Sequence, residues 1–108
     1  MFNYFKYAQI TIDDVIIRAY NKPMDITFDP DKNAANIENR GLSFEDFAGF
    51  DGVPSVVVDD RYDYGETRYQ ARGRINGKGF CIVYTLTATG IRLISFRRAH
   101  EKEMRRYE

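Results

Sequence analysis

The chain has little of what marks a secreted, metal-binding or membrane protein. Its 108 residues include one cysteine, Cys81, one histidine, His100, and no tryptophan. A single cysteine cannot form an internal disulfide, so we expect a reducing, cytoplasmic compartment. No apolar run approaches the ~20 residues of a spanning helix, the N-terminus lacks a signal-peptide pattern, and no metal-ligand spacing is visible. The sequence therefore predicts a cytoplasmic protein with no cofactor, no metal and no membrane partner.

The formal net charge is also zero, which argues against a general nucleic-acid binder. The charges are nevertheless unevenly distributed along the chain. Residues 25–66 contain three basic and eleven acidic residues, whereas residues 67–108 contain ten basic and three acidic ones. This asymmetry has two interpretations: a basic surface for an anionic partner, or two halves that neutralise each other across one fold.

The pattern of apolar residues predicts one α+β domain that is long enough to bury a core. Residues 1–23 form an N-terminal extension, in which a short helix is one interpretation, and residues 24–108 form the main domain. We expect an antiparallel sheet of four to five strands, two N-terminal helices and a charged C-terminal helix beginning near Arg98. The expected strands cover residues 24–28, 55–60, 67–75, 78–86 and 91–96, and the expected helices cover residues 29–41 and 43–50.

Capping residues support the two helices. Asp29, Pro30 and Gly41 are typical of the start and end of a helix, and Ala34, Ala35 and Ile37 are expected to face inward. Ser43 and Asp46 form a variant capping box for the second helix. Phe44, Phe47 and Phe50 are expected to lie together.

The clearest local prediction is a hairpin turning at Asn76-Gly77. A two-residue turn places Ile75 opposite Lys78, Arg72 opposite Cys81 and Tyr69 opposite Tyr84. One face of the hairpin is then core, with the helices packed on it, and the other face carries Arg68, Arg72 and Arg74. Either nearby carboxylates (Glu66, Asp59, Asp60 and Asp63) or a bound phosphate backbone could compensate these arginines.

In the last strand, the spacing of two arginines raises the question of whether they lie on the same face. Arg92 and Arg97 are five residues apart, so a regular strand places them on opposite faces. They can converge only if the strand ends or bulges near Phe96. Without a bulge, Arg97 at the strand end is the better candidate for a site.

The sequence "ITFDPDKNAANIENRGLSFEDF" resembles the opening of BrnT-type toxins. The matching residues are Phe28, Asp29, Lys32, Asn36, Gly41, Ser43, Phe44 and Glu45. The middle of the family pattern is similar to Glu66-Thr67-Arg68, and its end is similar to "RLISFRRA" followed by Glu103, Arg105 and Tyr107. The resemblance covers about residues 24–108.

The resemblance implies a RelE-like fold and a ribonuclease toxin of a bacterial toxin–antitoxin pair that acts without a metal. It implies an RNA substrate and a BrnA-like antitoxin partner, in a homodimer or a toxin–antitoxin heterotetramer. Arg68, Arg92 and Arg97 would stabilise charge on the phosphate, and Glu66 or Glu45 would be the base. We expect Arg72, Arg74, Lys78 and Arg98 to bind RNA.

Two departures from the family pattern leave an alternative open. Asn39-Arg40 replaces a lysine and a histidine, and Phe96 replaces an alanine. The alternative is a catalytically weakened relative that mainly binds its antitoxin. His100 could transfer protons, although a solvated histidine is the interpretation that the charged tail favours. Cys81 needs no role beyond packing. The excess of basic residues in the C-terminal tail favours a surface that binds a partner.

Overall fold

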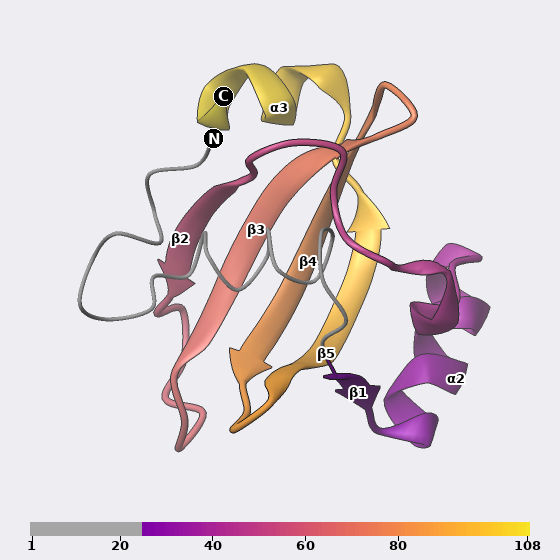
Figure 1. Cartoon of the computed structure of the whole chain (residues 1–108), viewed down its shortest axis with the longest axis vertical. Coiled ribbons are helices and arrows are strands. Elements are labelled where there is room, and N and C mark those ends of the chain that lie inside the picture. Colours follow the sequence, from indigo (N-terminus) through magenta and orange to yellow (C-terminus); the bar gives the residue numbers. More distant parts are fainter. Residues whose placement is uncertain (1–24) are drawn as a thin grey trace.

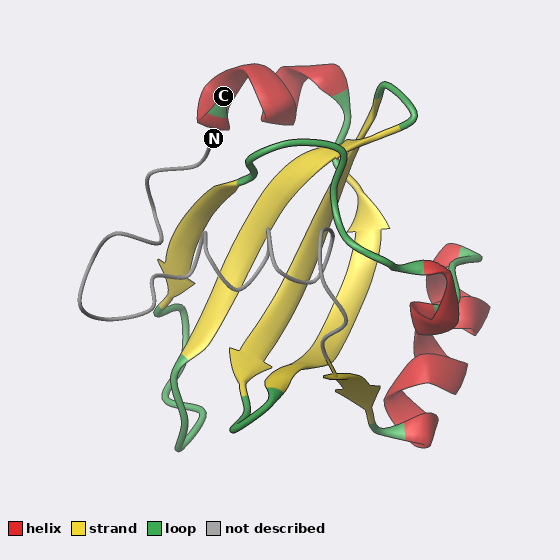
Figure 2. Cartoon of the chain, in the orientation of Figure 1, coloured by secondary structure: helices red, strands yellow, loops and turns green. Residues whose placement is uncertain are grey.

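The computed structural model describes residues 25–108, and the helix considered for residues 11–22 lies outside them. The described residues form a five-stranded sheet with α-helices at its margins (Figures 1 and 2). The elements are β1 (Asp25–Phe28), α2 (Pro30–Arg40), the short 3-10 helix η2 (Phe44–Asp46), β2 (Ser55–Asp59), β3 (Arg68–Ile75), β4 (Lys78–Leu86), β5 (Gly90–Arg98) and α3 (Glu101–Tyr107). The α+β class is therefore confirmed.

The sheet is mixed, so the prediction of a purely antiparallel sheet is wrong. Its strand order is β1-β5-β4-β3-β2, and β1 pairs with β5 in parallel. The parallel pair arises because α2 and the following segment carry the chain from β1 to the opposite edge of the sheet. The remaining neighbours are antiparallel, and the β3–β4 register agrees with the hairpin prediction at Ile75–Lys78, Arg72–Cys81 and Tyr69–Tyr84.

The helix α2 begins and ends at the predicted caps. The Asp29 side chain accepts a hydrogen bond from the Asp31 N–H, and Gly41 adopts a left-handed φ of 72°. The predicted inward face is wrong, because Ala34, Ala35 and Ile37 are exposed. Asn33 and Asn36 are buried instead, since α2 docks beside β5 through hydrogen bonds rather than through an apolar stripe (Figure 1).

The second predicted helix, residues 43–50, is reduced to the single turn η2. After this turn the chain becomes extended, with Phe47 at φ −89° and ψ 116°. The segment then crosses one face of the sheet in front of β3 and β4 (Figure 1). Phe44, Phe47 and Phe50 lie in the core beneath it, as predicted, because an extended crossing segment can bury all three rings as well as a helix can.

The main core lies between this segment and the sheet. It contains the three phenylalanines with Ala71, Ile82, Tyr84, Ile91, Leu93 and Phe96. The Phe50 ring packs directly on the backbone of Gly73, where an added Cβ would lie 2.6 Å from ring carbons. A side chain at position 73 would therefore displace the ring.

The opposite face of the sheet is not fully open to solvent, contrary to the prediction that the helices lie on the apolar side. The C-terminal helix α3 packs on it through a second small core of Cys81, Ala99 and Met104. Gly79 permits this contact, since a Cβ there would overlap the Ala99 carbonyl and the Met104 side chain. The charged tail is thus a docked helix, because one buried methionine anchors it to the sheet.

Candidate active site on the arginine face

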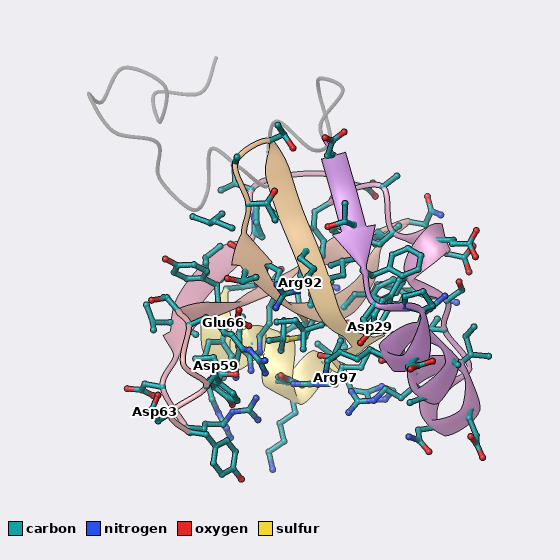
Figure 3. All side chains as sticks on the ribbon, turned by 90° about the horizontal axis from the view of Figure 1, so that it is seen from below. Asp29, Asp59, Asp63, Glu66, Arg92 and Arg97 are labelled. Atoms are coloured by element: carbon teal, nitrogen blue, oxygen red, sulfur yellow. The ribbon has the colours of Figure 1, made fainter. Side chains whose placement is uncertain are left out.

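The face of the sheet under α3 gathers most of the arginines of the strands, and we call it the arginine face. Side-chain alternation and the pairing register place these residues on it: Arg68, Gln70, Arg72 and Arg74 from β3, Cys81, Val83 and Thr85 from β4, and Arg92, Ser95 and Arg97 from β5. Figure 3 shows the labelled Glu66, Arg92 and Arg97 on one side of the strands.

A β-bulge in β5 brings Arg92 and Arg97 to the same face. Arg92 pairs with Thr85 and Arg97 pairs with Cys81, and these two β4 residues are four positions apart. The register shifts between Val83 and Tyr84, because Ile94 is an extra residue between their partners Ser95 and Leu93. A bulge therefore does bring the two arginines to one face, and it lies at Ile94, two residues before the predicted place near Phe96.

Arg72 and Arg97 converge on one carboxylate. The Arg72 Nε lies 2.6 Å from Glu103 Oε2, and Arg97 donates to both Glu103 oxygens at 2.8 Å. Arg97 is the more accessible of the two, with 34% of its side chain exposed against 6% for Arg72. Hydrogen bonds from Arg97, followed by those from Arg72, lower the pKa of Glu103 to about 2, so the carboxylate is ionised at neutral pH.

Arg72 is held on its other side by an aromatic ring. Its guanidinium lies 3.8 Å from the centroid of the Tyr107 ring. The Nη1 atom is buried and has no hydrogen-bond partner among residues 25–108. A buried guanidinium nitrogen without a partner is costly, and here it is tolerated beside the wall of a solvent-accessible groove.

The groove consists of adjoining hollows around Arg72 and Tyr107. One hollow of about 430 Å³ is lined by Arg72, Arg97, Arg98, His100, Lys102, Glu103, Arg106 and Tyr107. A second of similar volume also reaches Arg72, Arg97 and Tyr107, and its far wall contains Asp59, Asp60 and Arg61. Cations outnumber carboxylates in the first hollow, so its surface favours an anion.

A second carboxylate, Glu66, joins Arg68 to Arg92. Glu66 Oε2 accepts from Arg68 Nε at 3.0 Å, and both Glu66 oxygens accept from Arg92 Nη2, at 2.8 and 3.1 Å. Arg68, followed by Arg92, lowers the pKa of Glu66. The sequence places Glu66 and Arg68 together as neighbours, but the long-range pair with Arg92 comes from the sheet.

The predicted RNA-binding residues have different surroundings. The guanidinium of Arg74 bonds the carboxylates of Glu101 and Glu108, and Arg98 donates to the Gly79 carbonyl. Lys78 is exposed at the hairpin turn, where no ion pair with the described residues involves it. Glu45, the other candidate base, is exposed on η2, and its backbone N–H bonds the Ser43 hydroxyl.

Sequence reasoning gave no site role to Glu103 or Arg61. Asp59 is buried and holds Arg61 through two hydrogen bonds of 2.7 and 2.8 Å, which lowers the pKa of Asp59 to about 2. Glu103 was visible, like Tyr107, as a match to a family pattern. Their contacts depend on where α3 docks, and helical periodicity alone cannot specify that.

Within residues 25–108, no group of three His, Cys, Asp or Glu side chains is arranged to hold a metal ion. None of the helices in this part of the chain is long and apolar enough to cross a membrane.

Fold and site together define an α+β protein with an arginine-rich groove on one face of its sheet. The chain belongs to the BrnT family, since the family model for the ribonuclease toxin BrnT of type II toxin–antitoxin systems matches residues 28–103. The matched range includes Arg68, Arg92, Arg97 and Glu103, and it ends before Tyr107. A search of curated proteins found no match.

Proposed function

We propose that this chain is a toxin that cleaves RNA at the arginine face without a metal ion and is neutralised by a BrnA-like antitoxin. The observation that carries the proposal is the convergence of Arg72 and Arg97 on the Glu103 carboxylate. Two guanidinium groups that clamp one carboxylate present the donor geometry that also suits a phosphate. A RelE-like arrangement and a cytoplasmic location belong to the same proposal.

The proposed reaction is an internal transesterification of the RNA backbone. The 2′-oxygen forms a bond to phosphorus and loses its proton, while the bond from phosphorus to the 5′-oxygen breaks and that oxygen gains a proton. Negative charge grows on the non-bridging oxygens in the transition state. Preorganised cations aimed at those oxygens lower the barrier, and this is the contribution we assign to arginine.

Arg97 is the residue we place on the scissile phosphate, because it is partly exposed and lines both hollows. Arg72 is largely buried, so we assign it to positioning Glu103 and Tyr107. Arg92 and Arg68, joined by Glu66, would hold a neighbouring phosphate. The RNA chain would continue past this phosphate and contact Arg98, Arg74 and Lys78.

Proton transfer needs a group other than arginine, which stays protonated at neutral pH. The lowered pKa of Glu66 makes it a weak base, so we propose that Glu66 chiefly orients Arg68 and Arg92. His100 lines the hollow with Arg97 and Glu103, and its side chain makes no capping bond to α3. An imidazole ring can accept a proton at one nitrogen and donate one from the other, and His100 is therefore the proposed proton carrier.

Expression in bacteria and cleavage by purified protein test this function together. We expect growth arrest that a co-expressed antitoxin relieves, and cleavage of single-stranded RNA that persists in EDTA. Harmless expression, with RNA left intact by the purified chain, would refute the proposal. Tight antitoxin binding without RNA cleavage would favour the alternative, a catalytically weakened relative that mainly binds its antitoxin. Two departures from the family pattern suggest this alternative: the histidine is missing at Asn39-Arg40, and Phe96 replaces an alanine.

A further inference from the structure

The loop between β2 and β3 exposes an aromatic ring, Tyr62, next in sequence to the groove residue Arg61. Tyr62 is 71% exposed, which is the largest value among the exposed large hydrophobic residues of the described chain. A single exposed hydrophobic side chain is common in soluble proteins. What distinguishes Tyr62 from other exposed apolar residues is where its loop lies and which residues its ring contacts.

Tyr62 is fixed by a chain of contacts that leads to a buried carboxylate. Its ring meets the Tyr64 ring edge-on, at 5.8 Å between centroids and an angle of 75°. The Tyr64 hydroxyl lies 3.2 Å from Asp59 Oδ2, and the Arg68 guanidinium lies 4.2 Å from the Tyr64 centroid. The loop turns at Gly65, whose N–H bonds the Asp63 carboxylate. An aromatic ring held in this way loses little freedom when a planar ligand stacks on it.

The loop joins the two arginine clusters of the face. Arg61, the preceding residue, lines the hollow that also contains Arg72, Arg97 and Tyr107. Through Tyr64, the ring is linked to Arg68 and so to Glu66 and Arg92. Cations that follow a phosphate backbone, with aromatic rings placed among them, are typical of surfaces that bind single-stranded nucleic acid.

The acidic residues of the same loop limit what can lie there. Asp60 and Asp63 are exposed and would repel a phosphate group. Carboxylates accept hydrogen bonds from the amino groups of bases. The loop therefore suits the base edge of a nucleotide, while its phosphate lies toward the arginines.

We infer that Tyr62 is a stacking platform for an unpaired nucleobase next to the scissile phosphate, an inference that rests on the proposed ribonuclease function. The ring stacks on the base, Asp60 or Asp63 accepts from its amino group, and Arg61 contacts the adjoining phosphate. The site selects single-stranded RNA, because a base within a duplex does not present its face to the ring.

Binding of an uncleavable RNA tests this inference with the full chain. The probe is a single-stranded 2′-O-methyl oligonucleotide that carries 2-aminopurine, whose fluorescence falls on stacking. We expect Tyr62→Ala to weaken binding on the order of 5- to 100-fold and to abolish the quenching, whereas Tyr62→Phe retains both. With cleavable RNA, Tyr62→Ala should raise KM more than it lowers kcat.

Ile37→Ala is the matched control, since it removes an exposed apolar side chain from α2, away from the loop. Unchanged affinity and quenching in Tyr62→Ala would overturn the inference and leave the proposed function intact, provided that Arg97→Ala still loses cleavage. Unchanged RNA affinity with weaker antitoxin binding would reassign Tyr62 to the protein partner. A wild-type chain that neither binds nor cleaves RNA would overturn the proposed function together with this inference.

Discussion

Arg92 and Arg97 project from the same face of β5 although they are five positions apart. The bulge at Ile94 changes the alternation of β5, so that these residues pair with Thr85 and Cys81 on one face of β4. Their guanidinium groups are then held by different carboxylates, Glu66 and Glu103. Deletion of Ile94 would leave the two arginines four positions apart in a regular strand, so they would still lie on one face.

The Glu103 ion pairs should make folding stability depend on acid pH. Because the pKa of Glu103 falls from 4.5 to about 2 on folding, its contribution is fully present above pH 4.5 and is lost as the pH falls toward 2. This contribution is on the order of 2–3 kcal/mol. Urea unfolding should therefore show that Glu103→Gln costs more stability at pH 7 than at pH 2.5.

Comparison with Glu38→Gln, an exposed position on α2, controls for the loss of a surface carboxylate. Asp59 also contributes to acid sensitivity in the wild type and in both variants, and it cancels in the difference. A destabilisation by Glu103→Gln that does not change with pH would contradict the ion-pair account.

Two glycines should be intolerant of a methyl group for different reasons. Gly73→Ala places a carbon against the Phe50 ring, and Gly79→Ala places one against Met104 of α3. We expect each to cost about 1–3 kcal/mol, with Gly79→Ala also loosening Glu103 from Arg72 and Arg97. Thermal unfolding measures the cost, and Gly52→Ala is the control because nothing lies within 4 Å of a Cβ there. Equal melting temperatures for all three variants would disprove this packing.

Asn36 should stabilise the docking of α2 more than any apolar residue of that helix. Its amide donates to the carbonyls of Leu42 and Phe96 and accepts from the Phe96 N–H. Asn36→Ala leaves buried backbone groups unpaired and should cost about 2–4 kcal/mol, whereas Asn39→Ala, at an exposed position, should cost little. The measurement is the free energy of unfolding, and similar values for both variants would show that α2 docks in another way.

The rate of RNA cleavage by a His100 variant tests the role of this residue. If His100 carries a proton, His100→Gln should lower kcat about 10²-fold or more. The melting temperature should stay the same, because the residue is exposed. An unaltered kcat would instead support the interpretation of His100 as a solvated residue.

Local signals predicted the hairpin and the caps of α2 because they depend on neighbouring residues. The Asn76-Gly77 turn specified the β3–β4 register, which in turn placed Arg68, Arg72 and Arg74 on one face. The inward face of α2 was mispredicted, because apolar residues were assumed to face the core and its docking depends on asparagine hydrogen bonds to distant backbone groups.

The candidate site was less predictable because it depends on long-range contacts. Charge counting could not show that three arginines of the sheet, Arg72, Arg74 and Arg97, would pair with Glu101 and Glu103 of α3 and with Glu108 directly after it. Met104 docks the helix and thereby positions these carboxylates. Charge counting therefore favours a partner surface for the tail, whereas in the structure one side of the tail completes the groove.

The rate of RNA cleavage by Arg97→Ala, measured in EDTA beside the wild type, tests the central claim most directly. Arg105→Ala is the matched control, because Arg105 is exposed and lies outside the hollows described above. We predict that Arg97→Ala loses 10²- to 10³-fold in kcat while it stays folded, and that Arg105→Ala cleaves as the wild type does. Cleavage by Arg97→Ala at the wild-type rate, or loss of wild-type cleavage in EDTA, would contradict the account.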